Sequence, residues 1–418
     1  MSRLGLNRST VALLMAILLI GAGQELWAPF MPKYIQSTLE ARHPSAVMLL
    51  LAVGLFGSWK DFQEAVYYLL GGRLGARLGT RRALLIFSLV PFVGYILLLS
   101  SVAPWAAFAA LPFIAAYDSI AQPATLTTVA ASLSSHTRTM AFSLQAIQRR
   151  IPRIMAYLAG GALVAWLGAI GGVRASLVVS AGLVLLAFVV QLVLLKHDTK
   201  DAAPHPPISL ALLRRFDPRL KRLLLSDILA RIAEGLPREL FILYAVTSKV
   251  SHPSFGVYGI SAATFGQLLA LQAFVSLLTY LPVGYFASRG SKNPFITLTF
   301  IFFASFPLAF YLLGGWGLPG LVIAYAIAGL REIGEPARKA LITELLPADS
   351  RTAATGLYWS IRTFAVMLAP ILGAILWLTV SPGAVFITAA SIGYIGAALF
   401  FLTGKRRSEI DVQVPRRA

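Results

Sequence analysis

The chain has 418 residues, of which 57% are hydrophobic and 13% carry a charged side chain, about half the charged fraction of a soluble domain. This composition excludes a soluble globular protein and a largely disordered chain, and the absence of cysteine excludes a disulfide-stabilised fold and a cysteine-ligated zinc or iron–sulfur site. The formal net charge is +19, with 36 lysines and arginines against 17 acidic residues. The positions of the basic residues decide whether this positive charge indicates a nucleic-acid partner or the orientation of the chain in a membrane.

Apolar stretches long enough to cross a lipid bilayer follow one another along the chain. A spanning helix needs about 20 mostly apolar residues. Twelve stretches qualify: 10–35, 45–71, 83–102, 105–131, 139–168, 174–195, 223–248, 261–287, 294–314, 319–346, 352–379 and 384–403. The first is longer than the apolar core of a signal peptide and has a counterpart later in the chain, so we expect it to remain a span. The sequence therefore predicts an all-α polytopic membrane protein with twelve transmembrane helices.

The basic residues at the ends of these stretches gather on one side of the membrane. Most lie in the N-terminus, in the loops after even-numbered spans and in the C-terminal tail, whereas the other side holds Lys33, Arg42, Arg174 and Lys249. The positive-inside rule predicts that both termini are cytoplasmic, in the cell (inner or plasma) membrane. No basic face belongs to a folded soluble domain, so we expect the lipid bilayer, and no nucleic acid, as a partner.

A proline-rich and basic segment divides the chain into two parts with six predicted spans each. This segment, 196–222, is expected to be a cytoplasmic linker with a short surface helix around 208–216. It would join an N-terminal six-helix bundle at 1–195 to a C-terminal six-helix bundle at 223–404, and a cytoplasmic tail would follow at 405–418.

The two parts align with each other, in the same order throughout, at an offset of about 213 residues. The matched pairs are Glu25-Leu26-Trp27 with Glu239-Leu240-Phe241, Gly72 and Arg77 with Gly284 and Arg289, 118–124 with 331–337, and Arg138, Arg149 and Gly160 with Arg351, Arg362 and Gly373. A repeat in the same orientation predicts two bundles related by an axis along the membrane normal, with a central site near the midplane of the bilayer.

The segment 72–82 (GRLGARLGTRR) resembles the signature between spans 2 and 3 of the major facilitator superfamily, and the resemblance extends over essentially the whole chain. It implies two bundles that rock about a central cavity formed mainly by spans 1, 2, 4, 5, 7, 8, 10 and 11. It also implies a cytoplasmic gate loop, with Gly72, Arg77, Gly79 and Arg81 as its candidate residues.

Two departures and one further similarity qualify this resemblance. The family's aspartate in the signature is replaced by Ala76, and by Ser288 in the second copy, so we expect no acid-mediated latch. Arg77 and Arg81 should contact helix C-termini or backbone carbonyls instead. The segment 369–374 is similar to an element seen in exporters, which favours export.

Ionisable residues inside the predicted spans are costly and should face a polar interior. Burial favours the protonated form of a carboxylate, so an acidic residue in a cavity that opens to each side in turn can carry a proton. The proton-coupling candidates are Glu25, Asp61, Glu64, Asp118, Glu239 and Glu335. We place Glu25 first, because no basic residue lies within one helical turn of it. The alternative for each candidate is an ion pair that only holds helices together.

Arginines and aromatic residues in the spans indicate a site for a solute, because the guanidinium fork matches carboxylate or phosphate and aromatic rings line amphipathic pockets. The substrate-binding candidates are Trp27, Arg149, Arg153, Arg238, Arg331, Tyr358 and Arg362. Pairing of these arginines with the acids is again the alternative. We expect Asp227, Lys339 and Glu344 to lie at the cytoplasmic interface, outside the site.

Other features of the sequence narrow the class of function. There is no P-loop motif, all five histidines fall in predicted loops, and the loops are too short for a catalytic domain. We therefore expect no enzyme activity, no cofactor and no metal, but a secondary transporter driven by an ion gradient. The leading prediction is proton-coupled efflux (antiport) of a small organic solute by a monomer. The alternatives are an organic-anion symporter or exchanger that uses the arginines, and a polytopic membrane enzyme or receptor.

Overall fold

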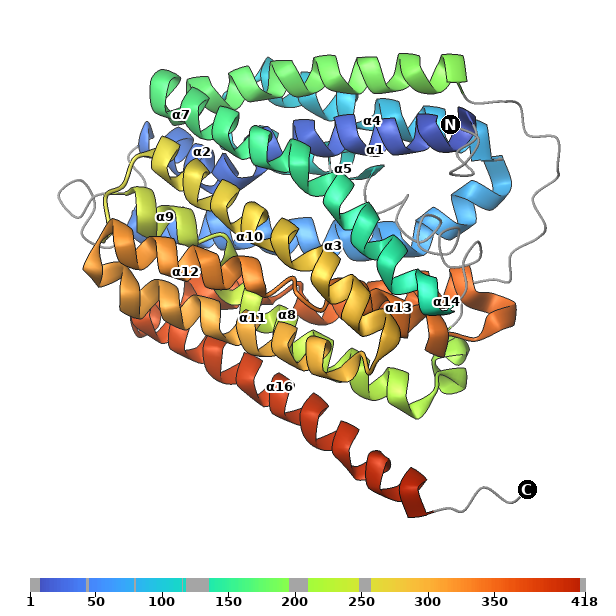
Figure 1. Ribbon diagram of the computed structural model, residues 1–418. Coiled ribbons are helices and arrows are strands. Elements are labelled where there is room, and N and C mark those ends of the chain that lie inside the picture. The colour runs from blue at the N-terminus through green and yellow to red at the C-terminus, as the bar shows by residue number, and fades with distance from the viewer. Residues whose placement is uncertain are drawn as a thin grey trace.

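The computed structural model describes residues 8–42, 45–78, 80–114, 116–117, 135–194, 210–247 and 257–413. Within these ranges the regular structure is helical and contains no strand, and long helices lie side by side (Figure 1). The all-α fold class predicted from the sequence is confirmed.

The first half of the chain folds into long helices that match the predicted spans. They are α1 (Arg8–Trp27), the 3-10 helix η2 (Ala28–Phe30), α2 (Met31–Glu40), α3 (Ala46–Leu78), α4 (Thr80–Ser100), α5 (Pro104–Ile114) and α7 (Ser135–Leu194). The first three elements share one predicted span. Pro29 and Pro32 stand where it changes helix type, because proline lacks the backbone N–H that a continuous helix requires.

The helix α7 contains two predicted spans, 139–168 and 174–195, joined by a sharp turn at Gly168. The φ angle of Gly168 is 74°, a left-handed conformation that glycine adopts without steric cost. Figure 1 shows the two legs of α7 diverging from this turn. The turn falls where the sequence separates the two predicted spans.

The second half contains more and shorter helices. They are η3 (Leu210–Arg215), α8 (Pro218–Arg238), α9 (Phe241–Val246), α10 (Ala262–Arg289), α11 (Asn293–Leu313), η4 (Gly314–Trp316), α12 (Leu318–Leu330), α13 (Glu335–Leu345), η5 (Ala348–Ser350), α14 (Arg351–Val366), α15 (Ala369–Thr379) and α16 (Pro382–Gln413). The helix α8 starts ahead of the predicted position 223, because the Asp217 carboxylate accepts a hydrogen bond from the Arg219 amide and Pro218 fits the first helical position.

Three predicted spans of the second half are each split into two helices. The breaks lie at 239–240, 331–334 and 367–368. A proline stands near each break, at Pro237, Pro336 and Pro370 respectively. Proline disfavours helical backbone in the residue before it and removes one hydrogen bond of the helix. Charged residues adjoin two of these breaks, at 239–240 and at 331–334.

The segment expected to form the cytoplasmic gate loop is mostly helical. The helix α3 continues to Leu78 and α4 begins at Thr80. Gly72 and Arg77 therefore lie in α3 and Arg81 lies in α4, while Gly79 and the side chains of 71–81 lie outside the described residues. The predicted loop is replaced by helix because the segment contains no proline and several good helix formers beyond the apolar stretch.

The two halves meet along two seams. In one, α3 packs against α14 and α15; in the other, α7 packs against α10. Glycine permits the close approach in both. A Cβ atom at Gly57 would lie 2.6 Å from Glu239 Cγ and 2.8 Å from Pro370 Cβ, and one at Gly161 would lie 2.8 Å from the Ala262 carbonyl oxygen. Small residues at helix contacts are typical of packing within a membrane.

Two hydrophobic cores and a separate small cluster, formed by Tyr157, Ala270 and Ala273, fill the described part of the molecule. The large core runs through the first half into the second, where Leu236, Phe306 and Ala328 belong to it. The small core lies in the second half and includes Ala230 and Trp359; Tyr68 is its one fully buried member from the described residues of the first half. The apolar interior of the second half is therefore divided in two.

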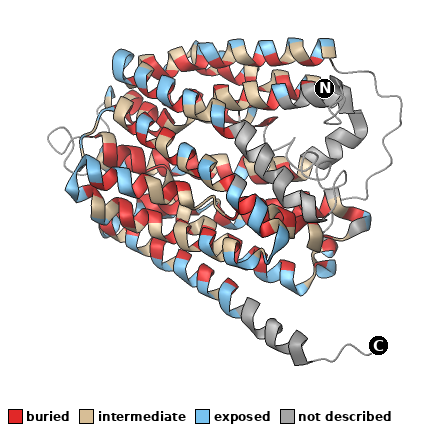
Figure 2. Ribbon diagram, in the orientation of Figure 1, coloured by how far each residue is buried: buried red, intermediate tan, exposed pale blue. Residues whose placement is uncertain are grey.

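The outer surface of the helices is apolar as well. Trp166 is 82% exposed and Trp316 is 68% exposed, and exposed residues face outward along the helices in Figure 2. Among the described residues, five helical stretches are long and apolar enough to cross a membrane: Arg150–Leu194, Ala262–Arg289, Asn293–Trp316, Ala353–Thr379 and Pro382–Leu402. These features fit an integral multi-pass membrane protein, and the total of twelve spans stays a prediction.

Candidate functional site

A layer of charged side chains separates the two cores of the second half. It consists of Arg231 and Glu234 on α8, Arg331 and Glu335 at the break between α12 and α13, and Arg362 on α14, and we call these five residues the charged layer. Along α8, Ala230 of the small core precedes the layer and Leu236 of the large core follows it. The helix break at 331–334 falls within the layer, an arrangement typical of binding sites inside membranes.

Most of the charged layer is internally paired. Glu234 accepts a hydrogen bond from Arg231 Nη1 at 2.7 Å and contacts Arg331 Nη1 at 3.2 Å. Both guanidinium groups lie over the Phe303 ring, with Cζ to centroid distances of 4.7 Å and 5.3 Å. Opposite charges and an aromatic face therefore offset the cost of placing these groups away from water.

Asp227 lies next to the charged layer and is only 1% exposed. Its carboxylate accepts hydrogen bonds from Arg338 at 2.5 Å and from the Tyr358 hydroxyl at 3.2 Å, and Arg338 also donates to Glu335. The expectation of interfacial exposure for Asp227 was wrong, because the side chain is buried. The reason is the early start of α8, which places Asp227 deeper in the molecule, together with a partner from a helix distant in sequence.

The other two residues assigned to that interface are ion-paired as well. Lys339 Nζ lies 3.5 Å from a carboxylate oxygen of Glu335, and Lys292 Nζ lies 3.2 Å from one of Glu344.

One ion pair joins the two halves between α3 and α8. Arg238 Nη2 donates to both carboxylate oxygens of Asp61, at 2.9 Å and 3.0 Å, and Asp61 is 2% exposed. Arg238 Nε also donates to Glu239 at 2.9 Å, and Lys60 Nζ lies 4.0 Å from the same carboxylate. Three of the predicted candidates, Asp61, Arg238 and Glu239, are thus brought together by the fold.

A second ion pair joins the halves between α7 and the break after α12. Arg150 Nη2 lies 3.0 Å from Glu332 Oε2. The Tyr280 hydroxyl of α10 accepts a hydrogen bond from Arg150 at 3.2 Å and donates one to Glu332 at 3.3 Å. Arg150 and Tyr280 were not among the candidates, and no pattern in the sequence singles them out from their neighbours.

Glu25, the first candidate for proton coupling, is paired inside the first half. Its Oε1 lies 2.5 Å from Arg153 Nη2 on α7. This contact joins two candidates that are far apart in sequence, and it corresponds to the structural alternative considered for Glu25.

Glu64 differs from the other described carboxylate candidates, because no ion pair to it is found among the described residues. It accepts a hydrogen bond from the Tyr68 hydroxyl at 2.5 Å, one turn along α3. The Tyr68 ring lies 6.2 Å from the ring of Trp359, and the Arg362 guanidinium lies 4.1 Å from the centroid of that second ring. Glu64 therefore connects to the charged layer through two aromatic rings.

Polar contacts also close the seam between the halves at the end of the molecule away from the start of α1 and the end of α16 (Figure 1). Lys33 Nζ of α2 donates to Gln36 at 2.9 Å and to the Thr247 hydroxyl, just after α9, at 3.1 Å. Thr247 is 3% exposed. The two halves are therefore in contact at this end.

The remaining candidates lie elsewhere or outside the described residues. Trp27 belongs to the large core, where its ring meets Tyr95 edge-on at 6.2 Å. Asp118 and the side chain of Arg149 fall outside the described residues.

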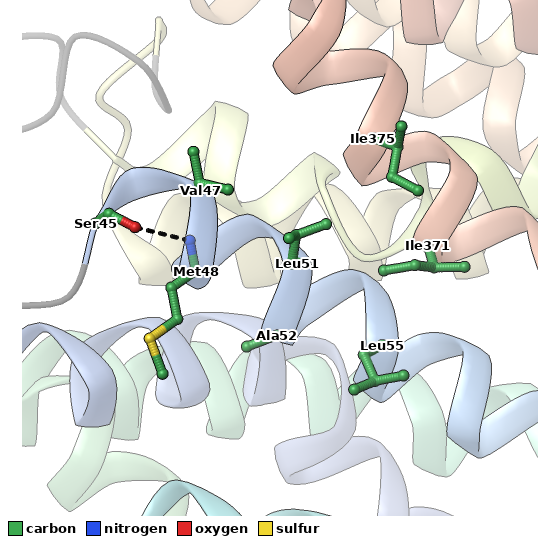
Figure 3. A pocket seen from close by; sticks show the side chains of 8 residues that line it. All are labelled: Ser45, Val47, Met48, Leu51, Ala52, Leu55, Ile371 and Ile375. Carbon is green, nitrogen blue, oxygen red and sulfur yellow. Dashed lines mark hydrogen bonds between the residues drawn. The ribbon is translucent and has the colours of Figure 1, made fainter.

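An apolar groove of about 520 Å³ lies between α3 and α15 (Figure 3). It is lined by Ser45, Val47, Met48, Leu51, Ala52, Leu55, Ile371 and Ile375. None of these residues is ionisable, and the Ser45 hydroxyl is already bonded to the Met48 amide. A solute site needs a few polar groups to fix the orientation of its ligand, so the charged residues are the better candidate.

Comparison with known proteins identifies the family to which this architecture belongs. The sequence model of the Major Facilitator Superfamily matches residues 13–250 and 232–418. The chain belongs to the major facilitator superfamily. This confirms the resemblance found in the sequence, and it identifies this superfamily member as a secondary transporter rather than an enzyme. No curated protein sequence matches the chain.

Solved structures of transporters share the fold of this superfamily member. The human organic anion transporter MFSD10 (TETRAN) is 17% identical, with a TM-score of 0.70 over 94% of this chain and 99% of that one. The nucleoside transporter NupG, in a mutant form, is 14% identical, with a TM-score of 0.69 over 95% of this chain and 99% of that one. At these identities the likeness shows the fold alone.

Proposed function

We propose that this superfamily member exports a small organic solute in exchange for protons, by exposing a central site to each side of the membrane in turn. In this proposal twelve spans form two six-helix bundles, 1–195 and 223–404, joined by the linker 196–222. Both termini are cytoplasmic, in the cell membrane, and the protein acts as a monomer. The observation that carries the proposal is that buried ion pairs join the two halves at Asp61–Arg238 and Arg150–Glu332.

Such pairs can link a proton to a change of conformation. An ionised Asp61 holds Arg238 across the seam through charge-assisted hydrogen bonds. A proton on Asp61 would remove the negative charge and weaken this contact, so the halves could separate more easily. Proton binding and opening are then thermodynamically linked.

Glu64 is our choice for the residue that takes up the proton. It lies one turn from Asp61 on α3 and is held by a hydroxyl rather than by a cation. Glu25 moves down the order, because Arg153 already neutralises it.

The test compares Glu64→Gln with Glu25→Gln in proteoliposomes. Benzoate, uridine and tetraphenylphosphonium serve as an anionic, a neutral and a cationic solute, and flux is measured in both directions with and without a pH gradient. We expect Glu64→Gln to lose gradient-driven flux but to keep solute exchange. Glu25→Gln should lower the melting temperature instead, because it leaves Arg153 without its carboxylate. Gradient-driven flux of Glu64→Gln at the wild-type rate would contradict the assignment.

A second candidate function is the transport of an organic anion. The observation that favours it is the excess of cations among the described residues around the charged layer. Four carboxylates there, Asp227, Glu234, Glu332 and Glu335, face six cations, Arg150, Arg231, Arg331, Arg338, Lys339 and Arg362. The similar fold of a human organic anion transporter supports the same candidate.

A further inference from the structure

Arg362 stands apart from the other cations around the charged layer. Among the described residues its nearest carboxylate oxygen is Asp227 Oδ2, at 3.9 Å, which is beyond hydrogen-bond distance. That oxygen already accepts hydrogen bonds from Arg338 and from the Tyr358 hydroxyl. Arg362 Nη1 is buried and has no hydrogen-bond partner in the described part of the chain. The guanidinium group rests instead on the face of the Trp359 ring.

Two more donors on the same helix are left unused. Trp359 Nε1 and Thr363 Oγ1 are buried and, within the described residues, have no hydrogen-bond partner. Arg362, Trp359 and Thr363 are 8%, 2% and 6% exposed. A buried donor without an acceptor destabilises a fold, and a buried cation without an anion does so more strongly. Several buried polar groups without partners in one place are typical of functional sites.

The position of Arg362 suits a ligand that both halves can reach. Trp359, beneath the guanidinium, lies against Tyr68 of the first half, and Tyr68 in turn is bonded to Glu64. An anion on Arg362 would supply a negative charge in a region where, among the described residues, cations exceed carboxylates. Arginine binds carboxylate and phosphate groups well, because its parallel N–H groups match their oxygens.

We propose that Arg362, Trp359 and Thr363 form the subsite on α14 that binds the carboxylate or phosphate group of an organic anion. This subsite deepens the proposed function: it rests on the chain carrying a solute, but not on the coupling ion or on the direction of transport. It also implies that Arg362 is present for binding and not for stability.

The experiment uses the purified full chain in detergent and measures melting temperature with and without three probes: benzoate, phenyl phosphate and neutral benzamide. The variants are Arg362→Gln and Trp359→Phe; the second keeps an aromatic ring, although a smaller one, and removes the N–H donor. The matched control is Arg289→Gln, because Arg289 also lies over an aromatic ring, that of Tyr285 at 4.0 Å, but on the surface.

Without a probe, Arg362→Gln should melt at or above the wild-type temperature, because it removes a buried cation to which no described carboxylate is hydrogen-bonded. At least one of the two anions should stabilise the wild type and the Arg289→Gln control, whereas benzamide should not. The anion concentration for half of this effect should rise ten- to a hundredfold in Arg362→Gln, and less in Trp359→Phe. Stabilisation by benzoate or by phenyl phosphate alone would identify which group the subsite accepts.

Three results would overturn the subsite: no stabilisation of the wild type by either anion, equal stabilisation of Arg362→Gln, or a clear fall in the melting temperature of unliganded Arg362→Gln. The last result would give Arg362 a structural role. The proposed function fails separately. If anions bind through Arg362 but a pH gradient drives no flux, the proton coupling is wrong and the subsite stands.

Discussion

Replacing Asp61 by asparagine tests the ion pair that joins the halves at α3 and α8. The substitution keeps the shape of the side chain but leaves Arg238 without the carboxylate that it contacts at 2.9 Å and 3.0 Å. Breaking a buried ion pair from one side costs about 3–5 kcal/mol. Arg238 keeps its bond to Glu239 and is 27% exposed, so we expect about 3 kcal/mol, at the lower end of that range.

Thermal unfolding of the purified chain measures this loss. Asp61→Asn should lower the melting temperature by several degrees. The matched control is Asp349→Asn, which also removes an aspartate bonded to an arginine, Arg215 at 2.7 Å, but on the exposed surface. The control should melt like the wild type, because exposed ion pairs contribute little.

The same substitution should shift the balance of conformations. A loss of about 3 kcal/mol corresponds to about a hundredfold change in an equilibrium constant. Because the chain contains no cysteine, Thr247→Cys provides a single labelling site at the seam beside Lys33. Asp61→Asn should increase its labelling by a membrane-impermeant maleimide. An unchanged melting temperature together with unchanged labelling would refute the reasoning. The double variant Asp61→Asn with Arg238→Gln should lose less stability than the two single variants added together.

Other variants test the packing, the gate segment and an exposed pair. Gly57→Ala should lower stability by about 1–3 kcal/mol, since its Cβ would lie 2.6 Å from Glu239 Cγ. The control Gly21→Ala, where the new Cβ has open space around it, should raise stability by up to about 1 kcal/mol. Equal melting temperatures of the two variants would contradict the close packing at Gly57. Ala76→Asp should restore the family's acid and favour closure of the cytoplasmic side, which reduced labelling of cysteines placed on that side would report. The hydrogen bond from Arg215 lowers the pKa of Asp349, so its stabilising effect should be present above the usual titration range of aspartate and be lost as the pH falls through the lowered pKa. NMR can follow the titration of the Asp349 carboxyl. A pKa at or above the usual value for aspartate would disprove this prediction.

The fold class and the approximate positions of the helices could be predicted from the sequence, because apolar length is a local property. The family was found in this way, and so was the gap between the predicted spans 139–168 and 174–195, which lies beside the turn at Gly168. The three breaks inside predicted spans of the second half were not predicted. The partners of the charged residues could not be predicted from the sequence, since Glu25 meets Arg153 and Asp227 meets Arg338 only through packing of distant helices. Spacing within one helix does not show partners on distant helices, so Glu25 was predicted to be unpaired and Asp227 to be exposed.

The large core makes it costly to part the two halves around Lys33. The large core is shared by both halves, so parting them at the end that holds Lys33 and Thr247 would expose apolar surface to water. A bound solute would have to contribute the free energy of this exposure before the halves could part at that end.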